Sequence, residues 1–416
     1  MRRLLRWTNG CSDARLESSG PVMLRIFSTS NMRGLFAPRC SAFFIAVLFL
    51  SAAPLPAQTV NKQQAMLLTQ QGKFKEAKEA WLQLAAHDPN DYVVEANLGL
   101  VLAQLGDYKD AITAYHKSLA SHPNEPGVRM NLGLAEFKEG NFAAASSSFS
   151  AIASSTTPDP RLETLLGLSF YGQQLYEKAI PHLTIASQND PSNPQLHYVL
   201  AESCLHGMKP ECTLAESQKL LQLSPDSAAA HMLLGEAYDG TKQENEAITE
   251  FTAAAAANPS QPNVHFGLGY LYWKKHEYDQ AAPEFKAEVD HDPKNAQSLT
   301  YLGDIAYRNN NDDEAAASLL KAVHLQPNIR LAYFDLGCVY ARENKNADAI
   351  TAFKEAERLD PTEPDAHYRL ARIYMASGQK QKADAEFLKT KSLHQKEQES
   401  IIEKMAANTP ANPPAN

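Results

Sequence analysis

The sequence has few cysteines and no segment of concentrated positive charge. Its 416 residues include five cysteines, and no two of them have the CxxC spacing of common metal and redox sites. The formal net charge is −9; seven arginines and two acidic residues lie in residues 1–57, which leaves −14 on the rest of the chain. A disulfide-rich scaffold is therefore excluded, and the charge argues against nucleic acid or an anionic membrane as the main partner.

The sequence also lacks the common catalytic and phosphate-binding motifs. It contains no HExxH, no GxSxG and no phosphate loop that ends in Gly-Lys-Ser/Thr. Gly267 and Gly269 have the spacing that opens a dinucleotide loop, but Tyr272 replaces the last glycine of that loop. The acidic run Asn309–Glu314 lacks the turn glycine and distal glutamate of a calcium loop, so we interpret it as a solvated turn. We expect no catalytic activity, no cofactor and no metal.

A long apolar run is present near the N-terminus. Every residue from Phe43 to Leu50 is apolar, arginines precede this run, and small residues and prolines follow it. With its flanking small residues the run is about 13 residues long, whereas a membrane-spanning helix needs about 20. The pattern predicts a secretory signal peptide in residues 1–57, with cleavage after Ala57, rather than a membrane anchor. Residues 1–31 would make its positive front unusually long, so Met32 is an alternative start.

A spacing of 34 residues recurs along residues 58–397. Ten blocks of 34 fill this range without an insertion, and a position within a block is called a place here, numbered from 1. Place 7 is leucine in nine blocks, place 8 is always glycine or alanine, and most blocks have a large apolar residue at place 24 and proline at place 32. Places 4, 7, 8 and 11 form one helical stripe, and places 20, 24 and 27 form another. Each block is therefore predicted to be a helical hairpin that stacks on its neighbours.

Place 15 lies between the two stripes, where the first helix is expected to end. A glycine there tolerates a left-handed backbone, which is a common way to end a helix. Four blocks have this glycine, at Gly72, Gly106, Gly140 and Gly378. The fifth block departs most from the pattern, with Met208 at place 15, Thr213 at place 20 and Ser217 at place 24. We expect its second helix to start late or to be shifted.

These columns resemble the tetratricopeptide repeat family, through the 34-residue period and the Leu-Gly, Tyr, Ala, Phe and Pro positions. The resemblance covers residues 58–397. It implies an all-α, right-handed superhelical solenoid of antiparallel helical hairpins, and a scaffold that binds protein or peptide segments without catalysis. Residues 398–416 are interpreted as the end of a capping helix followed by a polar, proline-rich disordered tail.

Four histidines share place 4, namely His197, His231, His265 and His367. A metal–imidazole bond is about 2.1 Å long, whereas packed helices lie about 8–10 Å apart. Histidines in successive blocks therefore cannot share one ion, and we interpret them as half-buried packing residues.

Two cysteines lie close to the bend of the fifth block. Cys204 at place 11 and Cys212 at place 19 are mirrored across this bend, and mirrored places face each other in an antiparallel hairpin. An exported protein meets oxidising conditions in many settings, so a disulfide is one interpretation and two small apolar residues is the other. Cys338 would remain unpaired.

In the resembled family, the first helix of each hairpin lines the inner wall of the superhelix, at places 2, 5, 6, 9, 12 and 13. Here these wall places change from apolar and amide residues in early blocks to aromatic residues in later ones, with cations at place 13 and with Asp304 and Asp335 among them. The wall also includes Tyr301 and Tyr368. The resemblance implies a peptide-binding set in the concave groove: Asn97, Asn131, Phe137, Tyr198, Phe266, Tyr270, Trp273, Lys274, Tyr307, Arg308, Phe334 and Arg342.

We therefore expect an exported periplasmic or extracellular scaffold that binds an extended peptide with apolar anchors and an acidic group. We expect no nucleic acid partner and no stable membrane span after cleavage of the signal peptide. Two alternatives remain open. One is a structural assembly factor of the cell envelope that uses its convex surface or its ends, and the other is an enzyme with a site on the inner wall.

Overall fold

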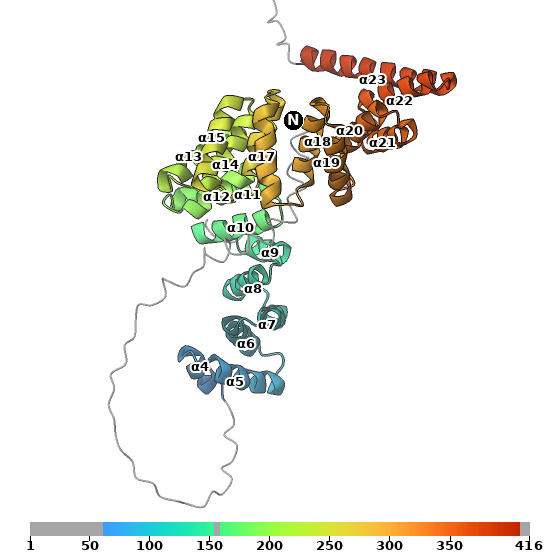
Figure 1. Cartoon of the computed structure of the whole chain (residues 1–416). Coiled ribbons are helices and arrows are strands. Elements are labelled where there is room, and N and C mark those ends of the chain that lie inside the picture. The colour runs from blue at the N-terminus through green and yellow to red at the C-terminus, as the bar shows by residue number, and fades with distance from the viewer. Residues whose placement is uncertain (1–60, 154–158, 408–416) are drawn as a thin grey trace, which may run out of the picture. The chain divides into compact units, whose positions relative to one another are not determined.

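The computed structural model describes residues 61–153 and 159–407, and these residues form helices joined by turns (Figure 1). The predicted signal peptide, with its cleavage after Ala57, lies outside the described residues, as do residues 408–416 of the predicted tail. Among the described helices, none combines the length and the apolar character needed to cross a membrane.

The chain divides into two compact units after the fifth block. Unit 1 comprises Met1–Asp226 with Gly240–Lys242, and unit 2 comprises Ser227–Asp239 with Gln243–Asn416. The described helices of the first five blocks are α4 (Lys62–Gln70), α5 (Phe74–His87), α6 (Tyr92–Leu105), α7 (Tyr108–Ser121), α8 (Pro126–Lys138), α9 (Phe142–Ala153), α10 (Pro160–Gly172), α11 (Tyr176–Asn189), α12 (Pro194–His206) and α13 (Pro210–Leu223).

The last five blocks are built in the same way. Their helices are α14 (Ala228–Gly240), α15 (Glu244–Ala257), α16 (Val264–Lys274), α17 (Tyr278–His291), α18 (Ala296–Arg308), α19 (Asp312–Leu325), α20 (Arg330–Arg342), α21 (Asn346–Leu359), α22 (Pro364–Ala376) and α23 (Lys380–Ala407). The prediction of one helical hairpin per block is confirmed for all ten blocks.

Every second helix begins at place 17 of its block. The expected late start in the fifth block is therefore wrong, because α13 begins at Pro210, which is place 17. Proline suits this position, since the first turn of a helix leaves its N–H groups without intrahelical partners. Residues 398–407, predicted as the end of a capping helix, continue α23 from the last block without a break.

The residue at place 15 has a positive φ in all ten blocks. The four predicted glycines have φ between 71° and 85°. Non-glycine residues adopt the same conformation in the other blocks, at Gln174, Met208, Lys242, His276, Asn310 and Asn344. The bend thus keeps one geometry whether or not glycine is present, and six blocks hold a side chain in a backbone region that favours glycine.

The two helices of a hairpin approach closely at places 8 and 24. A Cβ atom added to Gly99 would lie 2.7 Å from the ring of Tyr115. The same close approach recurs at Gly133, Gly167, Gly235, Gly269, Gly303 and Gly337. In the fifth block place 24 is the small residue Ser217, and place 8 is Ala201; both are fully buried.

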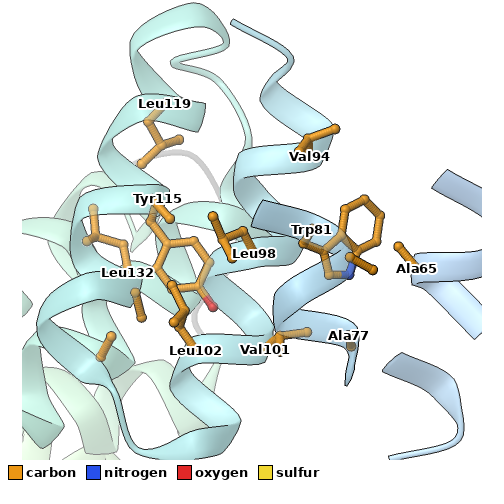
Figure 2. Close-up of a cluster of buried hydrophobic side chains, with 14 residues drawn as sticks. Ala65, Ala77, Trp81, Val94, Leu98, Val101, Leu102, Tyr115, Leu119 and Leu132 are labelled. Carbon is orange, nitrogen blue, oxygen red and sulfur yellow. The ribbon is translucent and has the colours of Figure 1, made fainter. Parts of the chain in front are cut away.

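The buried residues join each hairpin to the next one along the chain. Figure 2 shows Tyr115 of α7 with Leu98 and Leu102 of α6 and Leu132 of the following helix α8. One aromatic side chain therefore fills the space between two helices of its own block and one of the next block. Burial of such apolar surface is the main favourable contribution to folding.

Candidate functional site

Four aromatic side chains on the first helices of unit 2 form a connected cluster, called the aromatic wall here. Its members are Phe266, Tyr270 and Trp273 of α16 and Tyr301 of α18. The ring centroids of Trp273 and Tyr301 are 4.9 Å apart in an edge arrangement, and Tyr270 lies 5.8 Å from Tyr301. Below them, Tyr301 stacks on Phe285 at 5.0 Å. Phe266 is buried, whereas the other three members are partly buried, so the wall has a buried base and a partly exposed face.

Trp273 is held in place by a buried carboxylate. Its indole Nε1 donates a hydrogen bond of 2.6 Å to Asp304 Oδ2, and Arg308 Nε donates to the same oxygen at 2.8 Å. The Asp304 side chain is 2% exposed. The hydrogen bond to Asp304 raises the pKa of Arg308 above its ordinary value. Trp273 therefore satisfies its one polar group within unit 2 and leaves part of its ring exposed.

Further aromatic residues follow on α18, α20 and α22. Arg342 stacks on the Tyr307 ring at 3.8 Å and donates through Nη1 to the Tyr307 carbonyl at 3.0 Å. Phe334 meets Phe353 edge-on at 5.6 Å. Tyr368 is exposed on α22. These residues extend the aromatic surface along unit 2, which agrees with the predicted placement of aromatic residues on first helices.

Lys274, Arg308 and Arg342 all stand at place 13, which predicts a positive edge beside the aromatic residues, and each of them has an acidic partner inside unit 2. Lys274 Nζ lies 2.8 Å from Asp239 Oδ1 and 2.9 Å from Glu244 Oε1. Partial burial acts to lower the pKa of Lys274, but its hydrogen bonds to these two carboxylates hold the pKa above the ordinary value. Arg308 pairs with Asp304, as described above.

Arg342 completes the set, with Nη1 2.9 Å from Asp312 Oδ1. The residues of the predicted edge are therefore present, but their charges are compensated within the protein. A ligand carboxylate would have to compete with these existing partners.

Asp335 of α20 lies buried near the same acidic and basic residues. It is 3% exposed, and its Oδ2 has no hydrogen-bond partner among the described residues. Burial raises the pKa of the Asp335 carboxyl well above its ordinary value, and the neighbouring Asp304 carboxylate adds to this effect. Burial of this oxygen without a hydrogen bond is an energetic cost to unit 2.

The four predicted binding residues of unit 1 are partly or fully buried, and two of them donate hydrogen bonds within unit 1. Asn97 donates its Nδ2 hydrogen bond to Val93 O of its own helix at 2.8 Å. Phe137 is 7% exposed, and Asn131 is half-buried. Tyr198 donates to the buried carboxylate of Glu202 at 2.7 Å. Tyr171 donates to the same Glu202 carboxylate, so two tyrosines meet at this buried group.

The place 4 histidines pair with glutamates of their own hairpins. In each case Nδ1 lies 2.6–2.7 Å from a glutamate at place 23, in the pairs His197–Glu216, His231–Glu250, His265–Glu284 and His367–Glu386. The fourth block has the same pair reversed, with Glu163 at place 4 and His182 at place 23, 2.6 Å apart. The interpretation as packing residues holds in part, since each imidazole also links the two helices of its hairpin by a polar contact.

Cys204 and Cys212 are joined by a disulfide in the structure, with Cα atoms 5.8 Å apart. The bond links the end of α12 to the start of α13, at the bend that contains Met208. Cys338 is free and buried. We predict the same bond in the exported protein, where peptide mapping without reductant should show one linked pair of peptides.

Sequence reasoning missed the acidic partners of the wall and the central position of Tyr301. The partner acids lie 30–35 residues before their cations in two cases, as in Lys274–Asp239 and Arg342–Asp312. A spacing close to the repeat length indicates contact between neighbouring blocks, and this signal could have found both pairs.

Comparisons with known proteins agree with the repeat pattern. A family model described as tetratricopeptide repeat matches residues 62–126, 96–160, 164–209, 214–262 and 266–328, and a second model with the same description matches residues 340–400. No curated protein matches the chain.

Several solved structures are similar to this chain. Yeast Tom70 is 14% identical over 83% of this chain and 94% of its own, with a TM-score of 0.37. A tetratricopeptide repeat protein from Parabacteroides merdae is 17% identical over 60% of this chain and 98% of its own, with a TM-score of 0.46. YrrB, described as a TPR protein with an unusual peptide-binding site, is 20% identical over 44% of this chain and 95% of its own, with a TM-score of 0.39.

The family models cover most of the chain, and the boundaries of the described helices repeat with the 34-residue period of the sequence. The chain therefore belongs to the tetratricopeptide repeat family.

Proposed function

We propose that this protein is an exported scaffold that binds an extended peptide segment on the aromatic wall of unit 2. Proteins of this family are typically non-catalytic and generally bind protein or peptide segments. One observation carries the choice of surface. Tyr270, Trp273 and Tyr301 form a partly exposed cluster on first helices, at places that do not belong to the buried stripe.

The wall has the properties of a good anchor site. Tryptophan and tyrosine contribute strongly to binding when they become buried in an interface. Trp273 is already oriented by its hydrogen bond to Asp304, and Tyr301 by its stack on Phe285. A ligand side chain would therefore meet rings that need little reorganisation, which lowers the entropic cost of binding.

The compensated charges shape the expected ligand. Lys274, Arg308 and Arg342 already contact carboxylates of unit 2, so an acidic group on the peptide gains little new electrostatic attraction. We propose that apolar and aromatic side chains of the peptide provide most of the affinity. Acidic groups of the peptide should contribute little to the affinity, because the three cations already have acidic partners.

A binding experiment tests the wall directly. Peptides are selected from a displayed random library on the chain from Gln58, and their affinities are measured by calorimetry. Trp273→Ala should weaken binding by about 2 kcal/mol or more, the range of interface hot spots. Leu320→Ala is the control, because Leu320 is 48% exposed on the second helix α19. Peptides that bind Trp273→Ala as tightly as the parent would show that the wall is not the site.

A convex-surface assembly factor is the second candidate. Exposed leucines on second helices favour it, with Leu320 of α19 at 48% and Leu388 of α23 at 68% exposure. A partner recovered from an envelope extract should lose binding to Leu320→Glu or Leu388→Glu and keep binding to Trp273→Ala if this alternative holds. The opposite pattern supports the aromatic wall.

Export is a separate part of the proposal, and it rests on the sequence of residues 1–57. The exported chain should begin at or near Gln58, as read by N-terminal sequencing. Recovery of a chain that retains Phe43–Leu50 in the membrane fraction would support an anchor and contradict cleavage.

A further inference from the structure

We propose that Glu357, His367 and Glu386 form a divalent-metal site in unit 2. They lie on α21, α22 and α23, respectively. One ligand atom from each lies within 4.8 Å of the other two. His367 Nδ1 is 2.7 Å from Glu386 Oε2 and 3.7 Å from Glu357 Oε1. Three helices that belong to two neighbouring blocks therefore converge on one point.

This site differs from the other histidine–glutamate pairs by a second carboxylate, which is its third ligand. Glu357 occupies place 28 of the block before His367. The residues at the same place before His197, His231 and His265 are Ser187, Leu221 and Ala255. The sequence argument against a metal considered several histidines around one ion, whereas this site needs only one histidine and two carboxylates.

The site is partly enclosed and already attracts a positive charge. The side chains of His367, Glu386 and Glu357 are 4%, 14% and 25% exposed. Lys389 Nζ lies 3.2 Å from Glu357 Oε1 and 3.2 Å from Glu386 Oε1. The Lys389 side chain is 49% exposed, so its ammonium can move into water when another cation takes this position. A metal ion can bind His367 through Nδ1 once the proton that Nδ1 shares with Glu386 has moved to Nε2 or to water.

The donor set selects the class of metal. One imidazole nitrogen and two carboxylate oxygens suit Zn²⁺ and similar transition-metal ions, whereas Mg²⁺ and Ca²⁺ prefer oxygen ligands alone. Metal–ligand bonds of about 2.0–2.2 Å place tetrahedral ligands about 3.4 Å apart. The Nδ1–Oε2 pair at 2.7 Å must therefore open by less than about 1 Å when the ion binds. Rotation of the glutamate side chain is enough for this movement.

A bound ion would fasten α23 to the two preceding helices. Metal bound only by the folded state stabilises that state, since the binding free energy adds to the free energy of unfolding. The site would thus hold the last described hairpin in place when Zn²⁺ is present.

Calorimetric titration of the chain from Gln58, prepared without a histidine tag, with Zn²⁺ alone tests the site. We expect one strongly bound equivalent. Glu357→Gln should weaken Zn²⁺ binding at least about tenfold, because one ligand charge is lost. Lys389→Gln should strengthen it about tenfold or more, because the competing ammonium is removed. Glu284→Gln is the matched control and should bind Zn²⁺ like the parent, since place 28 before the His265–Glu284 pair is Ala255 and not a glutamate.

Co²⁺ provides a second readout, because its visible absorption reports nitrogen and oxygen ligands in a tetrahedral arrangement. The spectrum should appear with the parent and Lys389→Gln and be lost in Glu357→Gln, whose circular dichroism should remain that of the parent. The proposal is overturned if neither the parent nor Lys389→Gln binds Zn²⁺. Equal binding by Glu357→Gln and the parent, or loss of binding in Glu284→Gln, would also overturn it by placing the ion elsewhere.

Discussion

At the residue scale, the tightest packing occurs where glycine at place 8 faces the large residue at place 24. Gly99→Ala would put a Cβ atom 2.7 Å from the Tyr115 ring, so the ring or the helix must shift. We expect a loss of about 1–3 kcal/mol in the free energy of unfolding, as for other overpacked cores. Chemical denaturation measures the change.

Gly127→Ala is the matched control, because nothing lies within 4 Å of an added Cβ atom in α8. This variant should be neutral or slightly more stable, since alanine favours a helix over glycine by about 0.5–1 kcal/mol. Equal destabilisation of the two variants would show that the contact with Tyr115 does not limit place 8.

The buried carboxyl of Asp335 predicts a pH-dependent cost. The pKa of Asp335 is higher in the folded protein than in the unfolded chain. The contribution of this carboxyl to stability is therefore fully present below its unfolded pKa and is lost as pH rises through its folded pKa. Asp335→Asn should therefore raise stability at pH 7–8, on the order of 1 kcal/mol, and the gain should vanish in acid near the unfolded pKa of about 3.9. Denaturation curves at several pH values measure it. Asp313→Asn is the control and should show no such pH dependence, because Asp313 is exposed. A gain in stability of Asp335→Asn that does not change with pH would contradict the role of the raised pKa.

The sequence predicted which residues would be large, small or aromatic at each place, but not their charge partners. Trp273 and Tyr307 were expected on the wall because the place number fixes the face of a helix. The pairing of Lys274 with Asp239 depends on how far one hairpin is rotated against the next. A spacing close to 34 residues indicates contact between neighbouring blocks, but the strength of each pairing depends on that rotation and could not be predicted.

At the scale of elements, the bend at place 15 carries a left-handed residue in every block. Lys242→Gly should stabilise the protein by about 0.5–1 kcal/mol, because a left-handed backbone costs other residues more than glycine. Asn344→Gly should change stability little, since asparagine tolerates this conformation. Thermal unfolding compares them. A loss of stability in Lys242→Gly would mean that its side chain makes a contact worth more than the backbone strain.

The fifth block shows why a departure in sequence need not become a departure in structure. Met208 has a φ of 56° at the place where other blocks have glycine, and Pro210 starts α13 at the usual place. The small Ser217 is matched by Ala201 in the facing helix. The backbone geometry is set by the neighbouring blocks as well as by local residues, and a single-block comparison could not include that contribution.

At the scale of the whole molecule, each unit contains its own buried clusters. Residues 58–226 and 227–416, expressed separately, should each show helical circular dichroism and a cooperative unfolding transition. Reductant should lower the stability of the first piece by about 2–3 kcal/mol, the value for closing a short loop. The second piece should not respond, because Cys338 is its one cysteine and is free. A piece that stays unfolded alone would show that the units depend on each other for folding.

The constant boundaries of the hairpins also make length an adjustable property of this protein. Second helices begin at the same place in every block, and glycine or alanine always stands at place 8. Removal of one whole block, such as residues 262–295, would join two blocks that have the same kinds of residue at the places that pack together. Removal of 30 residues would instead bring mismatched places together. The surface available to a partner can therefore grow or shrink by one hairpin at a time, while each remaining hairpin keeps the same packing contacts.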